Sequence, residues 1–209
     1  MNRAEILEIA KPILFNTDMV RATLEDRNSV TRRLLKPQPI LEYGLWVANG
    51  SGWSDGISSL RLIPGYSLYN RSPYKPGDYL YVRETWTNLN TLSCPCYYYK
   101  ASDTLPEWAL SSWKPSIHMP KEAARIFLRV KDVRVERLQN ITEEQAAKEG
   151  CINNIGFIHS PDNEYDRIHT AREHFITIWD STVPKKELDR YGWNANPWVW
   201  VIQFERVEV

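Results

Sequence analysis

The chain has 209 residues, and its 26 Lys and Arg are balanced by 26 Asp and Glu, which gives a formal net charge of zero. This length is sufficient for one well-buried core. The charge balance excludes a global positive field that would draw the protein onto nucleic acid, so such binding would have to come from a local patch. We expect most of the 9 Trp and 11 Tyr to lie in the core and a few to remain for stacking on a ligand.

The number of cysteines and the hydropathy of the chain indicate the cellular compartment in which we expect the protein. Three Cys residues do not make a disulfide scaffold and fit a reducing environment. No stretch approaches a membrane span of about 20 apolar residues. Residues 1–5 do not resemble a signal peptide, because they carry an acid and no long apolar run. We therefore expect a cytoplasmic protein without a membrane partner.

The N-terminal third predicts a short helix, an extended loop and a long excursion. Residues 17–25 are expected to be helical, because a capping residue precedes them and apolar residues recur at helical spacing. Pro37 and Pro39 then impose an extended loop. The stretch 44–71 is rich in Gly, Ser and Asn and predicts a long surface excursion, part of a loop-rich insertion at about 41–72.

The middle of the chain predicts strands. Pro76-Gly77 marks the centre of a turn, and an aromatic, β-branched strand follows over residues 79–86. Residues 97–101 predict a short neighbouring strand. Residues 125–138 alternate between apolar and basic side chains, and the apolar set changes face near Lys131-Asp132, where we expect a bulge.

The C-terminal third predicts two helices and a strand. Thr142-Glu143-Glu144-Gln145 is a capping box, and Gly150 stands where a left-handed C-terminal cap belongs. Residues 169–179 have helical spacing, and residues 198–205 have strand composition. Strands with a few short helices between them indicate the α+β class, in the form of a small β-barrel with short flanking helices.

One basic cluster stands out from this near-neutral chain. Residues 26–33 hold three arginines, two hydroxyls and one amide. Guanidinium groups suit phosphates and polar base edges, so the cluster predicts a nucleic-acid or nucleotide site. Arginines in an extended segment alternate in direction and cannot all face one ligand. We expect one of them to pair with an internal carboxylate such as Glu84.

Six segments together resemble an ASCH domain of the PUA-like β-barrel superfamily, of the type carried by phage and prophage proteins. They are Lys11-Pro12-Ile13-Leu14-Phe15, Thr31-Arg32-Arg33, Lys75-Pro76-Gly77-Asp78, Val82-Arg83-Glu84-Thr85-Trp86, Trp113-Lys114-Pro115-Ser116-Ile117-His118-Met119-Pro120 and Asn194-Ala195-Asn196-Pro197-Trp198-Val199-Trp200. The resemblance covers most of the chain except roughly residues 41–69. It implies a single PUA-like domain over residues 1–209, in the cytosol of a bacterial host, with a nucleic-acid or nucleoside pocket walled by the basic loop.

The same resemblance implies two kinds of chemistry. Some small bacterial ASCH proteins are amidohydrolases of acetylcytidine, and others are reported to cut RNA. In the amidohydrolases a Gly-Arg-Lys-Thr-x-Thr motif supplies a lysine and a threonine, and a glutamate lies on a later capped helix. Here Arg27, Ser29 and Thr31 fall on the motif and Glu149 falls at the glutamate. Asp26 and Asn28 stand where the family has the glycine and the lysine.

The candidate catalytic residues are therefore Thr31 as nucleophile and Glu149 as a carboxylate of the site. Asn28 cannot accept a proton, and Lys36 is the alternative base in the loop. The candidate binding residues are Arg27, Asn28, Ser29, Arg32, Arg33, Lys36, Arg83, Glu84, Trp86 and His118. Simpler roles stay open: Thr31 caps or packs, Glu149 is solvated or pairs with an arginine, and Trp86 belongs to the core.

The sequence gives little indication of a metal site or a cofactor site. Cys94-Pro95-Cys96, with Cys151 or His118, would be a zinc set, but a one-residue spacing is not that of structural zinc sites. We find no glycine-rich phosphate loop and no Gly-x-Ser-x-Gly elbow. We expect neither a metal nor a cofactor.

Three functions follow, in order of preference. The first is binding of RNA or a modified nucleoside by a PUA-like pocket, with DNA as an alternative ligand. The second is a hydrolase, of the acetylcytidine amidohydrolase or ribonuclease type, that uses Thr31 and Glu149; Asn28 favours a binder over an enzyme. The third is a phage–host protein-interaction module built on the tryptophan-bearing stretch 44–71. The sequence does not indicate base identity or oligomeric state.

Overall fold

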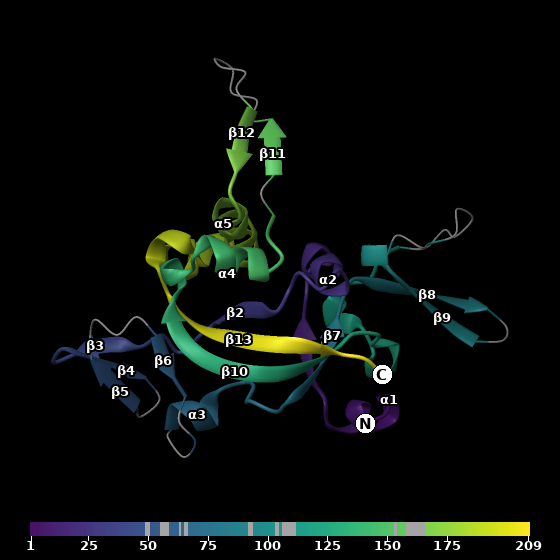
Figure 1. The fold of residues 1–209 in the computed structure, drawn as a ribbon, viewed down its shortest axis with the longest axis horizontal. Coiled ribbons are helices and arrows are strands. Elements are labelled where there is room, and N and C mark those ends of the chain that lie inside the picture. Colours follow the sequence, from purple (N-terminus) through teal and green to yellow (C-terminus); the bar gives the residue numbers. More distant parts are fainter. Residues whose placement is uncertain are drawn as a thin grey trace. The chain divides into compact units, whose positions relative to one another are not determined.

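The computed structural model describes residues 1–48, 51–54, 59–62, 64, 67–91, 94–102, 105, 112–152, 154–157 and 166–209 (Figure 1). The chain divides into two compact units. Unit 1 comprises Met1–Ser29, Pro76–Lys131 and Phe204–Val209, and unit 2 comprises Val30–Lys75 and Asp132–Gln203. Two long strands, β10 (Phe127–Arg137) and β13 (Trp198–Val207), contribute residues to both.

Unit 1 contains a short strand ladder, two helices and a hairpin. Its further elements are α1 (Arg3–Ile9), β1 (Lys11–Leu14), α2 (Thr17–Leu24), β7 (Tyr79–Arg83), β8 (Trp86–Thr91), β9 (Cys94–Tyr99), η1 (Lys100–Ser102), η2 (Ser116–His118) and η3 (Lys121–Ala123). Strand β1 pairs in parallel with β7, and β7 pairs antiparallel with residues 127–129 of β10. Strands β8 and β9 form a separate hairpin. The core gathers Ile6, Tyr81, Trp86, Met119 and Phe127.

Unit 2 contains a second ladder, covered on one face by helices. Its further elements are β2 (Val30–Leu34), β3 (Ile40–Glu42), β4 (Leu45–Ala48), β5 (Ser51–Ser54), β6 (Ser59–Arg61), α3 (Ser67–Arg71), η4 (Leu138–Asn140), α4 (Glu143–Lys148), β11 (Asn154–Phe157), β12 (Asp166–His169), α5 (Ala171–Thr182), η5 (Lys185–Glu187), α6 (Leu188–Tyr191) and η6 (Trp193–Ala195). Strand β2 pairs antiparallel with β13, and β6 pairs antiparallel with residues 134–136 of β10.

The core of unit 2 lies between this ladder and the helices. Val30 of β2 and Val199 and Val201 of β13 pack in one cluster with Phe175 and Trp179 of α5. Figure 1 shows α4 and α5 together on that side of β2. Apolar burial of this kind is the main source of the stability of such a layer.

Local signals in the sequence are confirmed at several helix ends and turns. Asn16 caps α2 by accepting from the backbone N of Met19 at 2.8 Å. Thr142 and Gln145 form the expected capping box at α4, and Gly150 follows the helix at φ +87°. Gly77 of the predicted turn has φ +93°, a backbone conformation that favours glycine.

The α+β class is confirmed, because helices and strands occur together along both units. The closed β-barrel stays a prediction. The strand pairings between described residues form open ladders and hairpins rather than a closed ring. Within the part of the chain that the structure describes, no helix is both long and apolar enough to cross a bilayer.

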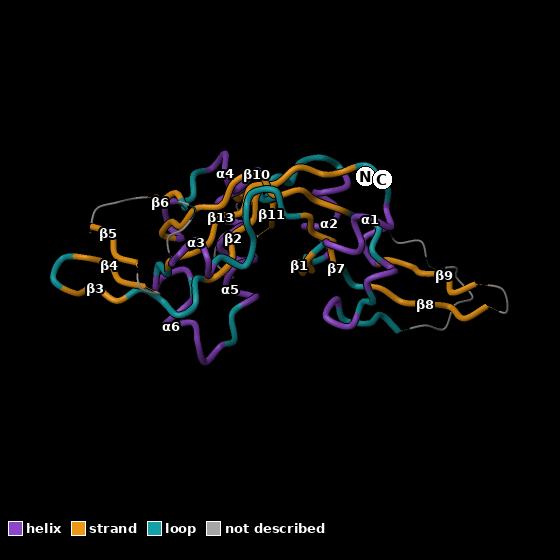
Figure 2. Tube along the Cα trace, turned by 90° about the horizontal axis from the view of Figure 1, so that it is seen from below, coloured by secondary structure: helices purple, strands orange, loops and turns teal. Residues whose placement is uncertain are grey.

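The predicted surface excursion contains more regular structure than its composition suggests. Strands β3, β4 and β5 form an antiparallel meander, which Figure 2 shows as a separate small sheet of unit 2. The turn between β3 and β4 places Tyr43 at φ +50° and Gly44 at φ +78°. This is the left-handed geometry of a tight two-residue hairpin, which composition alone does not reveal because tyrosine is not a usual residue there. The tip is apolar: Ile40, Tyr43 and Leu45 are all exposed.

Candidate functional site

Strand β2 carries the central part of the predicted site in unit 2. Its register with β13 pairs Thr31 with Ile202, Arg32 with Val201 and Arg33 with Trp200. Side chains alternate along a strand, and directly paired residues share a face. Arg32 therefore faces the helices, as its partner Val201 does, whereas Thr31 and Arg33 face the opposite side.

Arg32 is the centre of a buried ion-pair network. Its side chain has 0% exposure, and its Nη1 donates to Oε1 of Glu149 at 2.5 Å. Its Nη2 donates to Oε1 of Gln145 at 2.5 Å and lies 3.4 Å from Oε2 of Glu136. The backbone N of Arg32 also donates to Oε2 of Glu149 at 3.2 Å. The guanidinium therefore ties β2 to α4 and β10 rather than facing a ligand.

The network continues along β10 toward the surface. Arg134 Nε donates to Oε1 of Glu136 at 2.6 Å, and Arg134 Nη1 lies 3.8 Å from Oδ2 of Asp132. Asp132, Arg134 and Glu136 are two residues apart and so lie on the same face of the strand as one another. Charges of alternating sign thus run from the half-buried Asp132 to the buried Glu149.

Glu149 is the buried carboxylate at the C-terminal cap of α4. Burial raises its pKa, and the Arg32 guanidinium, with hydrogen bonds from Arg32, opposes this shift. A carboxylate at the C-terminus of a helix also faces the negative end of the helix dipole, which disfavours the charged form. The resemblance to the family motif predicted Glu149 as a site residue. In the structure its Oε2 accepts a hydrogen bond from the backbone N of Arg32, the residue after Thr31.

Thr31 and Arg33 form a polar pair on the other face of β2. The Thr31 side chain is fully buried, and its Oγ1 has no hydrogen-bond partner among the residues that the structure describes. The half-buried Arg33 donates from Nη1 to the backbone O of Arg32 at 3.3 Å. Burial lowers the pKa of Arg33, against the electrostatic effects of Tyr74 and Glu149. Trp200, directly paired with Arg33, adds an indole to the same face.

Lys36, two residues beyond β2, is exposed, and its Nζ lies 4.7 Å from the centre of the Tyr191 ring. This contact is a cation–π interaction. Nothing in the described contacts brings Lys36 to Thr31 as a base.

Three residues of the predicted basic loop belong to unit 1. Arg27 is exposed, and its Nε donates to Oε2 of Glu25 at 2.7 Å. Asn28 is buried, and its Nδ2 donates to the backbone O of Met19 at 3.4 Å, while its Oδ1 has no partner. Ser29 is half-buried, and its backbone O accepts from Phe204 N at 2.9 Å. These contacts hold the loop to its own unit.

The predicted carboxylate of unit 1 has a different partner from the one expected. Glu84 is 1% exposed and is held in a bidentate pair by Arg125, at 2.8 and 2.9 Å. The expectation that one arginine of residues 26–33 pairs with an internal carboxylate is confirmed by Arg32 and Glu149, but Glu84 is not that carboxylate. Arg125 precedes β10 and lies near Glu84 because β7 and β10 pair, a long-range contact that periodicity does not reveal.

The other predicted residues of unit 1 lie around β7 and β8. Arg83 donates from Nη2 to the backbone O of Ile117, and its buried Nε has no partner. Trp86 is buried, with Lys114 Nζ 4.8 Å from its ring centre. His118 is exposed at the end of η2.

The side chains of Cys96 and Cys151 are described, whereas that of Cys94 in the candidate zinc set lies outside the described part of the chain. Burial raises the pKa of Cys151 to about 12, so its thiol stays protonated. Cys96 is half-buried and free. Among the residues whose placement is described, no three His, Cys, Asp or Glu side chains gather as metal ligands.

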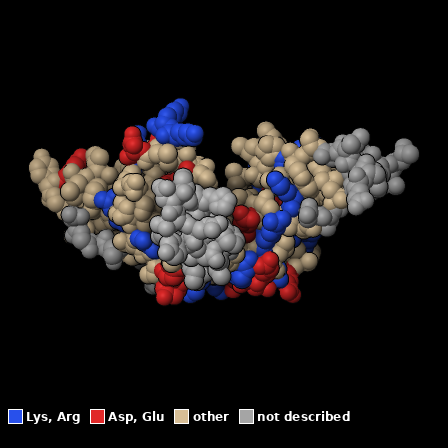
Figure 3. Space-filling view, turned by 90° about the horizontal axis from the view of Figure 1, so that it is seen from above, with Lys and Arg blue, Asp and Glu red and all other residues tan. Residues whose placement is uncertain are grey.

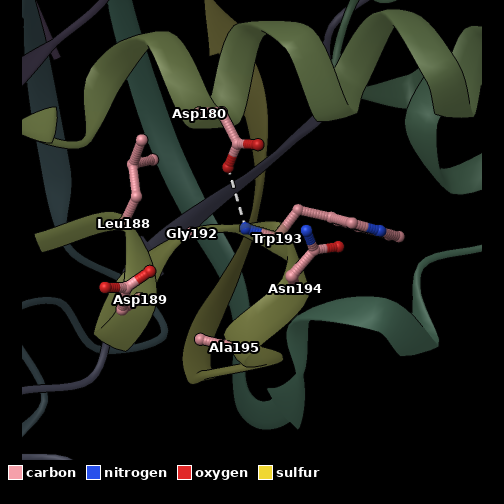
Figure 4. Close-up of a pocket in the computed structure, with 7 residues that line it drawn as sticks. All are labelled: Asp180, Leu188, Asp189, Gly192, Trp193, Asn194 and Ala195. Atoms are coloured by element: carbon pink, nitrogen blue, oxygen red, sulfur yellow. Dashed lines mark hydrogen bonds between the residues drawn. The ribbon is translucent and has the colours of Figure 1, made fainter.

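One hollow of unit 2 was not expected from the sequence. It has a volume of about 290 Å³ and is lined by Asp180, Leu188, Asp189, Gly192, Trp193, Asn194 and Ala195 (Figure 4). Asp180 Oδ1 accepts from the backbone N of Trp193 at 2.8 Å. Gly192 is required there, because a Cβ would stand 2.7 Å from the backbone O of Leu188.

Comparisons with known proteins assign no family to this arrangement. No protein-family model, no curated protein and no solved structure matches the chain. The ASCH-type interpretation therefore rests on the sequence motifs alone.

Proposed function

We propose that the chain binds RNA or a modified nucleoside at the face of β2 that carries Thr31 and Arg33. The observation that carries the proposal is the fully buried Thr31 hydroxyl, which lies beside the half-buried Arg33 and has no hydrogen-bond partner in the described part of the chain. The resemblance to ASCH domains and a PUA-like barrel belongs to the same proposal. DNA is the alternative nucleic acid.

The chemistry of this face suits a polar aromatic ligand. An unsatisfied buried hydroxyl costs about 1–3 kcal/mol, which a ligand with a donor or acceptor would recover. A guanidinium that is partly desolvated forms stronger charge-assisted hydrogen bonds to phosphate or base oxygens than one in water. Trp200 on the adjacent strand is buried beneath this face and adds an apolar, polarisable side chain next to Arg33.

Binding of nucleosides, RNA and DNA, measured by titration calorimetry and filter retention, tests the proposal. Thr31→Val keeps the shape of the side chain and removes the hydroxyl, and Arg33→Gln removes the charge. We expect each variant to weaken binding by about tenfold or more, because each lost hydrogen bond to a charged or buried group is of the order of 1.5–3 kcal/mol.

Matched controls are available in unit 1. Thr23→Val changes a buried threonine whose hydroxyl already donates to the backbone O of Met19 at 2.7 Å. Arg21→Gln removes an exposed arginine that pairs with Asp18. Neither should alter affinity. Absence of measurable binding by the unmodified protein to every nucleoside, RNA and DNA would overturn the proposal.

A hydrolase is the second candidate, and one observation favours it. Glu149 has a raised pKa and hydrogen bonds to the backbone N of Arg32, the residue that follows Thr31. A carboxylate with a raised pKa is a suitable general base near neutral pH. The Thr31 hydroxyl would attack the acyl carbon of the base amide, Glu149 would take its proton and return it to the leaving amine, and water would release the acyl group.

Three features weigh against catalysis, and the first is that the Thr31 hydroxyl, on the face of β2 away from the helices, makes no described hydrogen bond to Glu149. Asn28 cannot take a proton, and Glu149 is committed to Arg32. Incubation with acetylcytidine and with RNA, beside a Thr31→Ala protein, separates the alternatives. Turnover that depends on Thr31 would establish the hydrolase, and equal rates for both proteins, or none, would reject it.

A further inference from the structure

Many basic side chains of this chain are neutralised by a carboxylate. Lys11 Nζ lies 2.6 Å from Oδ2 of Asp78, and Lys131 Nζ lies 3.1 Å from Oε2 of Glu205. On the face drawn in Figure 3, Lys and Arg side chains alternate with Asp and Glu side chains. A group of basic residues without such partners is therefore informative about a ligand.

Four exposed residues of unit 2 form such a group, the Tyr191 basic patch: Lys36, Lys185, Lys186 and Arg190. Lys36 Nζ lies 4.7 Å and Arg190 Cζ lies 5.1 Å from the centre of the same Tyr191 ring. Lys185 and Lys186 stand on η5, which leads directly into α6 and Arg190. Across the described ranges of the chain, none of the four is in an ion pair with a carboxylate.

The nearby acids cancel only half of this charge, because four basic residues stand beside the two acids Glu187 and Asp189. Glu187 and Asp189 lie on the same two short elements, and Asp189 lines the hollow next to Asp180 (Figure 4). Lys186 lies on η5 and Arg190 on α6, so both belong to the short segment that carries Tyr191. An excess of exposed positive charge around one aromatic ring is suited to a polyanion.

We propose that the Tyr191 basic patch binds the phosphate backbone of a single-stranded RNA whose base occupies the face of Thr31 and Arg33. The ligand is then a strand rather than a free nucleoside, an inference that rests on the proposed function. Three residues of extended chain span at most about 11 Å, so Lys36 lies close to Arg33 along the same segment. Tyr191 packs on the helix side of β2, and β2 stands at the end of the strand order, so a strand of a few nucleotides that passes around this edge would reach both groups.

The test compares a triple variant of the patch with a variant of equal charge elsewhere. The patch variant combines Lys185→Gln, Lys186→Gln and Arg190→Gln. The control combines Arg21→Gln, Arg129→Gln and Lys131→Gln at exposed positions of unit 1. Affinity for an RNA decamer, the same sequence in DNA and the free nucleosides is measured by fluorescence anisotropy and calorimetry over a range of salt.

We expect the patch variant to lose RNA affinity by about tenfold or more and to keep the affinity for a nucleoside. The slope of log affinity against log salt should become shallower by about 2, because each phosphate contact on a single strand contributes about 0.7. An equal loss for the DNA strand assigns the contact to the phosphates, and a smaller loss assigns part of it to the ribose. The control variant should match the unmodified protein.

Three results would overturn the inference in distinguishable ways. If the patch variant keeps the RNA affinity and salt slope of the control, the patch does not bind the backbone, and nucleoside binding would leave the proposed function intact. If the patch variant loses nucleoside binding as well, the patch has no separate role. If the unmodified protein binds no nucleoside and no nucleic acid, the proposed function fails and the inference fails with it.

Discussion

Replacement of Arg32 with methionine is the most direct test of the buried network in unit 2. The substitution removes the partner of Glu149 Oε1 at 2.5 Å and leaves that carboxylate buried. Glu136 is less affected, because it keeps Arg134 at 2.6 Å. Breaking one side of a buried pair costs about 3–5 kcal/mol, and we expect the free energy of unfolding to fall by this amount in urea titrations.

The double variant Arg32→Met/Glu149→Leu distinguishes two contributions to the free energy of unfolding. One is the penalty of a buried charge without a partner, and the other is the stabilisation by the ion pair itself. The double variant removes both buried charges and replaces them with apolar side chains, so it should be more stable than Arg32→Met alone. Arg27→Met is the control, because Arg27 and Glu25 are both exposed and such pairs contribute about 0–1 kcal/mol. Two results would refute the argument that Arg32→Met leaves Glu149 as a buried charge without its partner. One is a loss of unfolding free energy below about 1 kcal/mol for Arg32→Met, and the other is a double variant less stable than Arg32→Met.

Three further predictions concern the same unit. Folding raises the pKa of Glu149 above its ordinary value of 4.5. The stability that Glu149 contributes is therefore fully present below pH 4.5 and is lost as the pH rises through the pKa of the folded state. Urea titrations should show the unmodified protein losing stability relative to Glu149→Gln over this pH range. Thr142→Ala removes the capping box of α4 and should lower the free energy of unfolding by about 1 kcal/mol, as seen in the urea midpoint. Gly192→Ala should destabilise by about 1–3 kcal/mol because its Cβ meets the backbone O of Leu188 at 2.7 Å, whereas Gly52→Ala, with no atom nearer than 3.8 Å, should leave the melting temperature almost unchanged.

Local elements were predictable where a few neighbouring residues determine them. The capping box at Thr142 and Gln145 and the left-handed Gly77 and Gly150 follow from short-range hydrogen bonds and backbone sterics. The strand between 125 and 138 also shows the expected change of face, since Val130 and then Val133 are buried. These features depend on sequence separations of a few residues, which a single sequence displays.

Partners across long separations were not predictable. Arg32 contacts Glu136 and Glu149, which lie 104 and 117 residues away. Glu84 was the example predicted for an internal carboxylate partner, but Glu84 is held by Arg125. A single sequence shows which charges will need a partner when buried, but not which strands will bring that partner near.

The structure gives the three arginines of residues 26–33 different surroundings, so they do not act as one basic cluster. Arg27 is exposed and paired with Glu25, and Arg32 is buried in the network of Glu149. Arg33 is left as the arginine of the cluster that shares a face with the unsatisfied Thr31 hydroxyl and with Trp200. The ligand site proposed on β2 would therefore use one guanidinium rather than three, and additional affinity for a polyanion would have to come from outside the cluster, as proposed for the Tyr191 basic patch.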